Sequence, residues 1–248
     1  VPRRDPSPGG RQETSRCTDG APCVCPVHPE IERRLTARKP TVTVDATGAT
    51  SAERLAAECL TLMADQTVAT TCVVFANSPA TARAVFEDIS AKSDSGVDVV
   101  LLTGRVREQE GAAIRSRLLC EVHGAPTSRR FVERPEASAA CPECRAGRGT
   151  PAALVVVATQ TLEVGADLDF DLLVTESASV RALVQRFGRL NRVGRANDRA
   201  SAVVVLSKPT DKQDGKRTWP VYGDEPGLVF DRLIEAEGFE GSVDLSPM

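Results

Sequence analysis

The residues with the clearest chemical potential are two arginines in an Arg-rich segment. Residues 185–192 read QRFGRLNR, which places Arg189 and Arg192 three positions apart. On a helix this spacing brings two guanidinium groups to one face, and Gly188 leaves no side chain to block a closely approaching partner. Two adjacent forked donors suit a triphosphate, whose transferred group spreads charge over its equatorial oxygens. The segment predicts a phosphate site, and a salt-bridged surface helix is the structural alternative.

Positive charge is concentrated around this segment. Between positions 181 and 199 six arginines stand against one acid, although the formal net charge of the chain is −3. The arginines are Arg181, Arg186, Arg189, Arg192, Arg195 and Arg199. A positive cluster on an otherwise acidic chain indicates a local phosphate site rather than a general nucleic-acid coat. A solvated helix face is the alternative interpretation.

Clustered cysteines and histidines form two candidate metal sites. The first set has the spacing C-x2-H-x17-C-x2-C, close to that of zinc ribbons and knuckles, because a tight turn aims paired ligands at one ion. Its residues are Cys120, His123, Cys141 and Cys144, and the second, less regular set comprises Cys17, Cys23, Cys25 and His28. The alternative is free thiols in an insertion. No paired acid or base accompanies either set, which favours a structural or DNA-facing role.

The eight cysteines also bear on the compartment. The first residues lack the apolar core of a signal peptide, so we expect a reducing, cytoplasmic environment, in which clustered cysteines favour metal over disulfides. Cys59 and Cys72 lie on apolar faces of predicted elements and are expected in the core.

Buried strands alternate with helices along the middle of the chain. An alternating β segment at 41–44 precedes apolar runs at 71–75, 97–102, 153–158, 172–174 and 202–206. Helices are predicted at about 51–66 with Ser51 as N-cap, from Pro79 to 89, at 108–119, 179–190 and 228–237. This order predicts an α/β fold, a parallel sheet with helices on both faces and right-handed crossovers. Ligands of such sheets bind beyond the carboxyl ends of the strands.

Composition excludes several classes of protein. The 248 residues are 41% hydrophobic and 26% charged, and no apolar run approaches the roughly 20 residues that span a bilayer, so no membrane segment is expected. Gly (18) and Pro (16) without a long repeat exclude collagenous and coiled-coil structures.

Two segments together resemble a known family. Residues 185–192 resemble motif VI of superfamily 2 helicases, and residues 157–171, VATQTLEVGADLDFD, resemble their motif V. The combination is most similar to the helicase–nuclease of type I CRISPR systems, and the Cys-rich insertions favour subtype I-U/I-G within that family. The resemblance covers about 41–208 and implies the second RecA-like domain of the helicase, with Cys-rich insertions.

The resemblance also implies roles for individual residues. Arg189 and Arg192 would complete an ATP site as arginine fingers, Gln185 would orient the attacking water, and Gly165 and Asp167 would face the nucleotide. Thr159 would bind a phosphate of single-stranded DNA, because a hydroxyl can do so without neutralising the charge. Further nucleic-acid contacts would come from Gln160, Glu163, Asn77, Ser78 and Arg105. Ordinary capping after a strand is the alternative for Thr159 and Glu163.

Expected parts of such a motor are missing from the sequence. No G-x-x-x-x-G-K-[ST] loop and no acidic Mg²⁺ box is present, and two histidines cannot build the family's His-Asp nuclease site. Asp224-Glu225-Pro226-Gly227 is interpreted as a turn rather than as such a box. The chain is therefore expected to be a fragment that does not hydrolyse ATP alone. Its expected domains are a Cys-rich linker or insertion at 1–40, the helicase domain at 41–208 with an insertion at about 120–150, and an accessory region at 209–248.

The sequence thus predicts the C-terminal motor half of an ATP-dependent single-strand DNA translocase or helicase in type I CRISPR interference. The implied cofactors are ATP and Mg²⁺, shared with a first RecA-like domain, and Zn²⁺. The implied partners are single-stranded DNA, the Cascade complex, that first domain and a His-Asp nuclease domain. The alternatives are a superfamily 2 helicase of another DNA or RNA pathway, and a zinc-stabilised nucleic-acid-binding module without motor activity.

Overall fold

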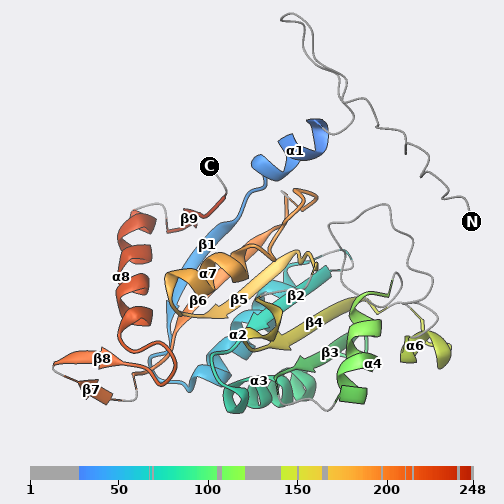
Figure 1. Ribbon diagram of the computed structural model, residues 1–248, viewed down its shortest axis with the longest axis horizontal. Coiled ribbons are helices and arrows are strands. Elements are labelled where there is room, and N and C mark those ends of the chain that lie inside the picture. Colours follow the sequence, from blue (N-terminus) through green and yellow to red (C-terminus); the bar gives the residue numbers. More distant parts are fainter. Residues whose placement is uncertain are drawn as a thin grey trace, which may run out of the picture.

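The computed structural model describes residues 28–66, 68, 70–104, 108–120, 141–149, 151–163, 167–196, 198–209, 211–213, 215–238 and 241–246. Within this part of the chain a seven-stranded sheet has the order β3-β4-β2-β5-β6-β1-β9 (Figure 1). Its strands are β1 (Pro40–Asp45), β2 (Thr70–Phe75), β3 (Val97–Leu102), β4 (Ala153–Ala158), β5 (Leu172–Glu176), β6 (Ser201–Leu206) and β9 (Val243–Asp244). All neighbours pair in parallel except β9, which runs antiparallel to β1.

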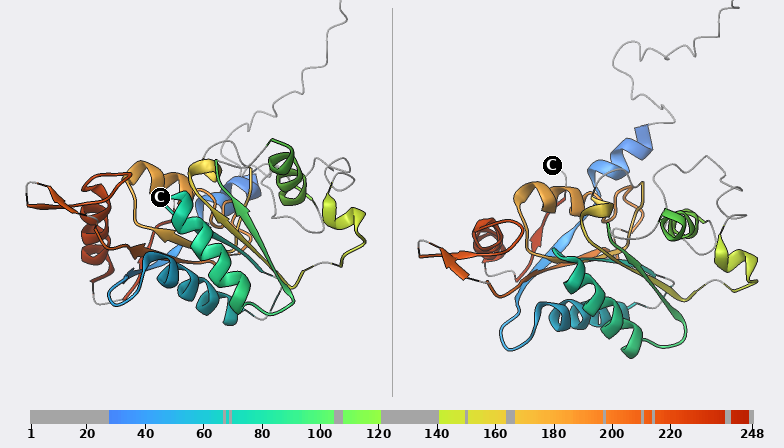
Figure 2. Two further views of the ribbon diagram at one scale, coloured as in Figure 1. Left: turned by 90° about the horizontal axis from the view of Figure 1, so that it is seen from below. Right: turned by 60° about the horizontal axis from the view of Figure 1, so that its bottom comes forward.

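Helices cover both faces of the sheet, as the sequence predicted. They are α1 (His28–Leu35), α2 (Ser51–Ala64), α3 (Pro79–Lys92), α4 (Glu108–Leu118), α6 (Pro142–Arg145), α7 (Val180–Phe187) and α8 (Glu225–Glu237), with a 3₁₀ helix η1 (Gln160–Leu162). The right-hand view of Figure 2 shows α2 and α3 below the sheet and α7 above it. None of the helices in the described ranges is long and apolar enough to cross a membrane.

Each face of the sheet packs its own apolar cluster. Alternate residues of the central strands point to opposite faces, so Cys72 and Val74 pack under α2 and α3, and Val73 and Phe75 pack under η1, α4, α7 and α8. Cys59 and Cys72 are fully buried with sulfurs 3.7 Å apart, which confirms their predicted place in the core.

Local hydrogen bonds correct one predicted helix boundary. The N-cap of α2 is Thr50 rather than Ser51, because the Thr50 hydroxyl accepts from the Glu53 amide and the Glu53 carboxylate accepts from the Thr50 amide. This reciprocal capping box satisfies two otherwise orphaned donors. Helix α3 begins at Pro79 as predicted, with Ser78 as its cap.

The region after Lys208 is more ordered than the sequence indicated. It contains the hairpin β7 (Asp211–Gln213) and β8 (Lys216–Thr218), then α8, then β9. The predicted turn at 224–227 is instead the start of α8, where Pro226 occupies the first turn without loss of a hydrogen bond. Trp219, whose indole donates to the Ser207 carbonyl at 2.9 Å, anchors this region to the end of β6.

Gly194 lets α1 approach the loop after α7, and its replacement gives a clear stability prediction. Its φ is +68°, and a Cβ built there would clash with the Arg33 carbonyl oxygen. Gly48 is the matched control, since its φ is +83° with nothing within 4 Å. We expect Gly48→Ala to cost about 1–2 kcal/mol of unfolding free energy, the penalty of the left-handed conformation. Gly194→Ala should cost about 1–3 kcal/mol more, because of the added overpacking.

Urea unfolding of the two variants measures this difference. Equal costs for both would show that α1 does not pack closely against the backbone at position 194.

Candidate functional site

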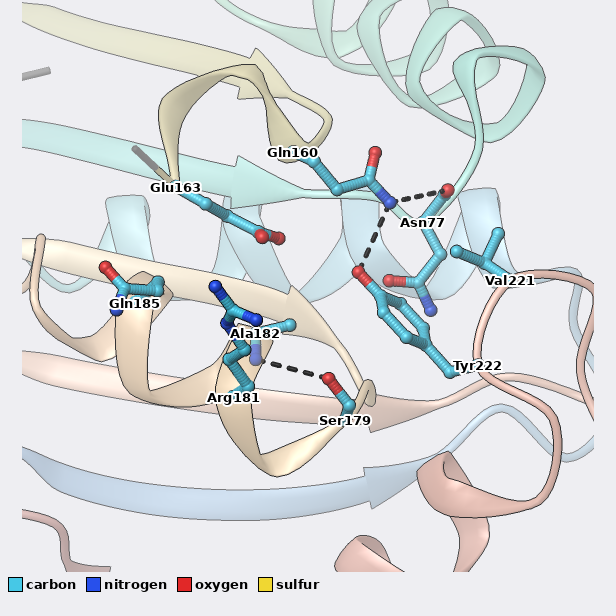
Figure 3. A pocket seen from close by; sticks show the side chains of 9 residues that line it. All are labelled: Asn77, Gln160, Glu163, Ser179, Arg181, Ala182, Gln185, Val221 and Tyr222. Carbon is cyan, nitrogen blue, oxygen red and sulfur yellow. Dashed lines mark hydrogen bonds between the residues drawn. The ribbon is translucent and has the colours of Figure 1, made fainter. Parts of the chain in front are cut away.

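A cavity of about 630 Å³ opens at the carboxyl edge of the sheet. Its lining comes from the ends of three adjacent strands, because Asn77 follows β2, Gln160 follows β4 and Ser179 follows β5. Gln185 of α7 and Tyr222, from the loop before α8, also line it (Figure 3). Four predicted site residues, Asn77, Gln160, Glu163 and Gln185, therefore share one cavity at the edge where the sequence placed the ligand.

Arg186 is the residue that joins the walls of this cavity. Its side chain is fully buried, and all five guanidinium N–H groups have an acceptor within 2.9–3.4 Å. The acceptors are Glu163 Oε1, Thr175 Oγ1, the Glu176 carbonyl, Asn77 Oδ1 and the Tyr222 hydroxyl. The guanidinium also lies over the Phe75 ring, 5.3 Å from its centroid. One buried cation thus connects the ends of β2 and β5 with η1 and the loop before α8.

Asn77 and Ser78 are held by the protein itself. The backbone amide of Asn77 donates to Glu176 Oε2 at 2.7 Å. The Asn77 side chain donates through Nδ2 to the Ser177 carbonyl and accepts through Oδ1 from Arg186. The Ser78 hydroxyl accepts from the Thr81 amide as the N-cap of α3. In this conformation both side chains position the end of β2 through hydrogen bonds within the protein.

The segment after β4 contributes Gln160 and Glu163 to the site. Gln160 Nε2 donates to the Asn77 carbonyl at 3.2 Å and to the Tyr222 hydroxyl at 3.3 Å (Figure 3). Glu163 forms the 2.9 Å ion pair with Arg186. Thr159 precedes η1 without a side-chain capping bond and is 3% exposed. Its hydroxyl is therefore almost enclosed in this conformation.

The two predicted arginine fingers do not share a helix, which corrects the sequence prediction. Helix α7 ends at Phe187 with Gly188 as C-cap, because the following segment pairs with the residues before β5: the Phe170 amide donates to the Arg189 carbonyl at 2.8 Å. Asn191 takes a φ of +43°, which turns the chain out of helical geometry. The i, i+3 spacing consequently does not bring the two guanidinium groups to one helical face.

Arg189 and Arg192 also have different surroundings. Arg189 is buried and donates to the carbonyls of Leu162 at 3.1 Å and Glu163 at 2.9 Å. Burial, with the nearby Arg192 charge, lowers its pKa. The Arg192 side chain is 38% exposed and lies 3.5 Å from Asp167. Arg192 is therefore the more accessible of the two, and Asp167 lies beside it.

Much of the positive charge in the Arg-rich segment is balanced by acids of the preceding segment. Asp169 accepts from Arg195 Nε at 3.2 Å and from the Arg192 amide at 2.7 Å. Asp171 pairs with Arg195 and with Arg199 at 3.3 and 3.0 Å. Burial raises the pKa of Asp169, against the opposing effect of Arg195. The run is neither a uniform phosphate site nor a solvated helix face, because sequence-distant carboxylates neutralise part of it.

Two exposed polar residues of α7 lie beside the cavity. Arg181 and Gln185 are both exposed and line it. The opposite face of the same helix buries Ala182, Leu183, Arg186 and Phe187. A buried lysine, Lys39, donates to the Phe187 carbonyl at 2.7 Å at the end of this helix, and burial lowers its pKa. The buried face of α7 and the Lys39 hydrogen bond thus hold the helix in place, while Arg181 and Gln185 are exposed to solvent.

Three of the predicted metal ligands converge elsewhere. The sulfurs of Cys120, Cys141 and Cys144 all lie within 4.8 Å of one another. The hydrogen bond with the Cys120 thiol, followed by burial, raises the pKa of Cys144 to about 12. His123, Arg105, Gly165, Cys17, Cys23 and Cys25 lie outside the described residues, and so does the side chain of His28.

The sequence placed Arg186 in the positive cluster without a role of its own, and it gave Tyr222 no role. A signal for Arg186 was available, because the spacing of Ala182, Leu183, Arg186 and Phe187 puts the arginine on the apolar face of its helix. A buried charge needs partners, so that position indicates a structural hub. Tyr222 gave no comparable signal, since only the tertiary fold brings its loop to the cavity.

Comparison with known proteins identifies the family. The family model described as "CRISPR-associated nuclease/helicase Cas3, C-terminal" matches residues 68–195, just over half of the chain. The chain belongs to this family. The prediction that the chain is the second RecA-like domain of a type I CRISPR helicase is therefore confirmed, and so is the predicted fold class.

Two Cas3 relatives align with parts of the chain. The CRISPR-associated endonuclease/helicase Cas3 of Thermus thermophilus is 41% identical over 81 residues, which cover 32% of this chain and 8% of the relative. The CRISPR-associated nuclease/helicase Cas3 of Methanothermobacter thermautotrophicus is 33% identical over 91 residues, 36% of this chain and 10% of the relative. The matched segments are thus a small part of each relative's length.

A solved Cas3 structure has the same fold. The ATP complex of T. fusca Cas3 superposes with a TM-score of 0.50 and 22% identity, covering 82% of this chain and 21% of that chain. At this identity the likeness concerns the fold, a sheet flanked by helices of the helicase C-terminal domain.

Proposed function

We propose that this chain is the C-terminal motor half of an ATP-dependent single-strand DNA translocase that acts in type I CRISPR interference. The observation that carries the proposal is the cavity at the carboxyl edge, where Arg186 of the motif VI segment is bonded to Glu163 of the motif V segment and to Asn77 after β2. A rigid connection of this kind suits a domain in which nucleotide state and DNA contact must change together. The Cas3 family match supports the biological context.

ATP and Mg²⁺ would bind between this domain and a first RecA-like domain that supplies the P-loop and the acidic Mg²⁺ box. Arg192 would reach the transferred phosphoryl group, where an arginine stabilises the developing charge. Arg189 would complete the site and, through its bonds to the Leu162 and Glu163 carbonyls, hold the segment after β4. Gln185, exposed on α7, would orient the attacking water, and Asp167 and Gly165 would face the nucleotide.

Single-stranded DNA would pass along the edge formed by the ends of β2, β3 and β4. Thr159 and Arg105 would contact its phosphates, while Asn77, Ser78 and Gln160 would shape the path. Glu163 would couple this contact to the nucleotide site, since it is joined to Arg186. Closing and reopening against the first domain would move the strand by steps.

The Cascade complex would recruit the complete protein to its target, and a His-Asp nuclease domain would cut the strand that the motor delivers. We infer a cytoplasmic location and subtype I-U/I-G from the same resemblance and from the Cys-rich insertions.

The test compares the full-length protein with this 248-residue chain. We expect the full-length protein to hydrolyse ATP faster when single-stranded DNA is added, and to move along it in a strand-displacement assay. The chain alone should hydrolyse none, because it contains no P-loop. A rate of ATP hydrolysis that single-stranded DNA leaves unchanged would contradict the proposed translocase activity. A full-length protein that binds DNA but hydrolyses no ATP would favour the binding-module alternative.

A further inference from the structure

Three thiols from two separate segments converge on one point. Cys120 follows α4, Cys141 is the N-cap of α6, and Cys144 lies within α6. Their sulfurs lie within 4.8 Å of one another, with Cys120 and Cys144 at 3.5 Å. A tetrahedral zinc site with Zn–S bonds of about 2.3 Å separates its sulfurs by roughly 3.8 Å. The observed spacing therefore fits three ligands of a single ion.

Ordinary packing does not account for these cysteines. Cys120 and Cys141 are 2% and 0% exposed, as core residues are, yet none of the three belongs to either apolar cluster of the sheet. Cys59 and Cys72 differ in this respect, because both pack within the cluster under α2 and α3. One disulfide would use two thiols and leave the third, whereas one ion uses all three. Soft thiolates are also the ligands that zinc prefers.

Contacts between α4, α6 and β3 position the segments that carry the thiols. Arg117, in the last turn of α4, forms an ion pair with Asp98 of β3 and lies 3.9 Å from Glu143 of α6. The Cys120 amide donates to the Arg117 carbonyl, and the Arg145 amide donates to the Cys141 carbonyl. These backbone hydrogen bonds hold Cys120 and Cys141 in place, and the Arg117 guanidinium beside them is paired with carboxylates.

We propose that Cys120, Cys141 and Cys144 bind one zinc ion that fastens α6 to the end of α4. Both helices belong to the crossover from β3, at the edge of the sheet, to β4. None of the three cysteines lines the cavity at the carboxyl edge, so the zinc is structural. His123, the fourth ligand predicted from the sequence spacing, lies outside the described residues. This site is independent of the proposed motor function.

The experiment measures zinc in the 248-residue chain with Cys17, Cys23 and Cys25 replaced by serine, which removes the second cysteine set. The protein is dialysed with Zn²⁺ and then against metal-free buffer. We expect one zinc ion per chain in this serine background and in the matched control Cys59→Ala. Adding Cys144→Ser or Cys120→Ser should lower the zinc content to less than about a tenth of that value. Cobalt in place of zinc should show thiolate-to-metal charge-transfer absorption, which Cys144→Ser should weaken.

Several results would overturn the proposal. The proposal fails if Cys144→Ser leaves the zinc content unchanged, or if the chain with Cys17, Cys23 and Cys25 replaced by serine holds no zinc. It also fails if the cobalt spectrum shows no thiolate-to-metal absorption. Cys144 is the partly exposed member of the three, so its variant keeps the test valid even if Cys120→Ser fails to fold, as circular dichroism will show. Chelation should lower the thermal midpoint of the parent chain and leave that of Cys144→Ser unchanged.

Discussion

Replacing Arg186 with methionine should lower the free energy of unfolding by about 3–5 kcal/mol, as expected when one partner of a buried ion pair is removed. The methionine approximates the volume of the arginine stem, so lost packing is minor. Five acceptors lose their donor, among them the nearly buried Glu163 carboxylate and the Asn77 side chain. Urea unfolding of the chain measures the loss.

A double-mutant cycle separates the ion pair from the rest of this network. Glu163→Gln together with Arg186→Met should be less destabilising than the sum of the single changes, by about 0.5–3 kcal/mol, because the orphaned carboxylate is gone. Arg181→Met is the matched control on the same helix, since Arg181 is exposed, and it should change stability by less than about 0.5 kcal/mol. A loss below 1 kcal/mol for Arg186→Met would show that this arginine does not hold the cavity together.

The second large effect concerns catalysis. In the full-length protein, Arg192→Ala should reduce DNA-stimulated ATP hydrolysis by about 10³-fold or more, the scale of a lost arginine finger, and leave DNA affinity nearly intact. Arg192 suits this role because its side chain is 38% exposed and its ion pair with Asp167 spans 3.5 Å. The measurement pairs steady-state ATP hydrolysis with equilibrium binding to single-stranded DNA.

Arg189→Ala should also abolish hydrolysis, but with an added cost in thermal stability, since two backbone carbonyls lose their donor. Arg232→Ala is the control. This arginine lies on α8, is exposed and pairs with Glu235, so its removal should leave hydrolysis unchanged. Equal losses of hydrolysis and DNA binding in Arg192→Ala would contradict the finger assignment, because such a result indicates a general DNA contact.

The sequence by itself determined the strands, the parallel sheet and the edge at which the cavity lies. Continuous runs such as 153–158 can be buried on both faces only in a sheet that helices cover on both sides, and parallel strands bring their carboxyl ends to one edge. The segments at 77–78 and 159–163 directly follow two of these strands, so they lie at that edge. The short motifs also sufficed to identify the family.

Tertiary structure decided how the charges are used. Local spacing put Arg189 and Arg192 on one helix, yet pairing between Phe170 and the segment after Gly188 ends α7 before either arginine. Asp169 and Asp171 neutralise arginines more than twenty positions away in the chain. A helical pattern reports only neighbours within a turn, so it could not show which acids the fold brings to those arginines.

The assembly around Arg186 has the same origin. Its position on the apolar face of α7 is typical of a buried residue, but its five partners come from four places in the chain, one of them the loop of Tyr222 beyond the last parallel strand. A buried guanidinium is stable only when all its donors are satisfied together. Periodicity fixes which face of a helix is buried, whereas the partners of a buried charge depend on the packing of the whole domain.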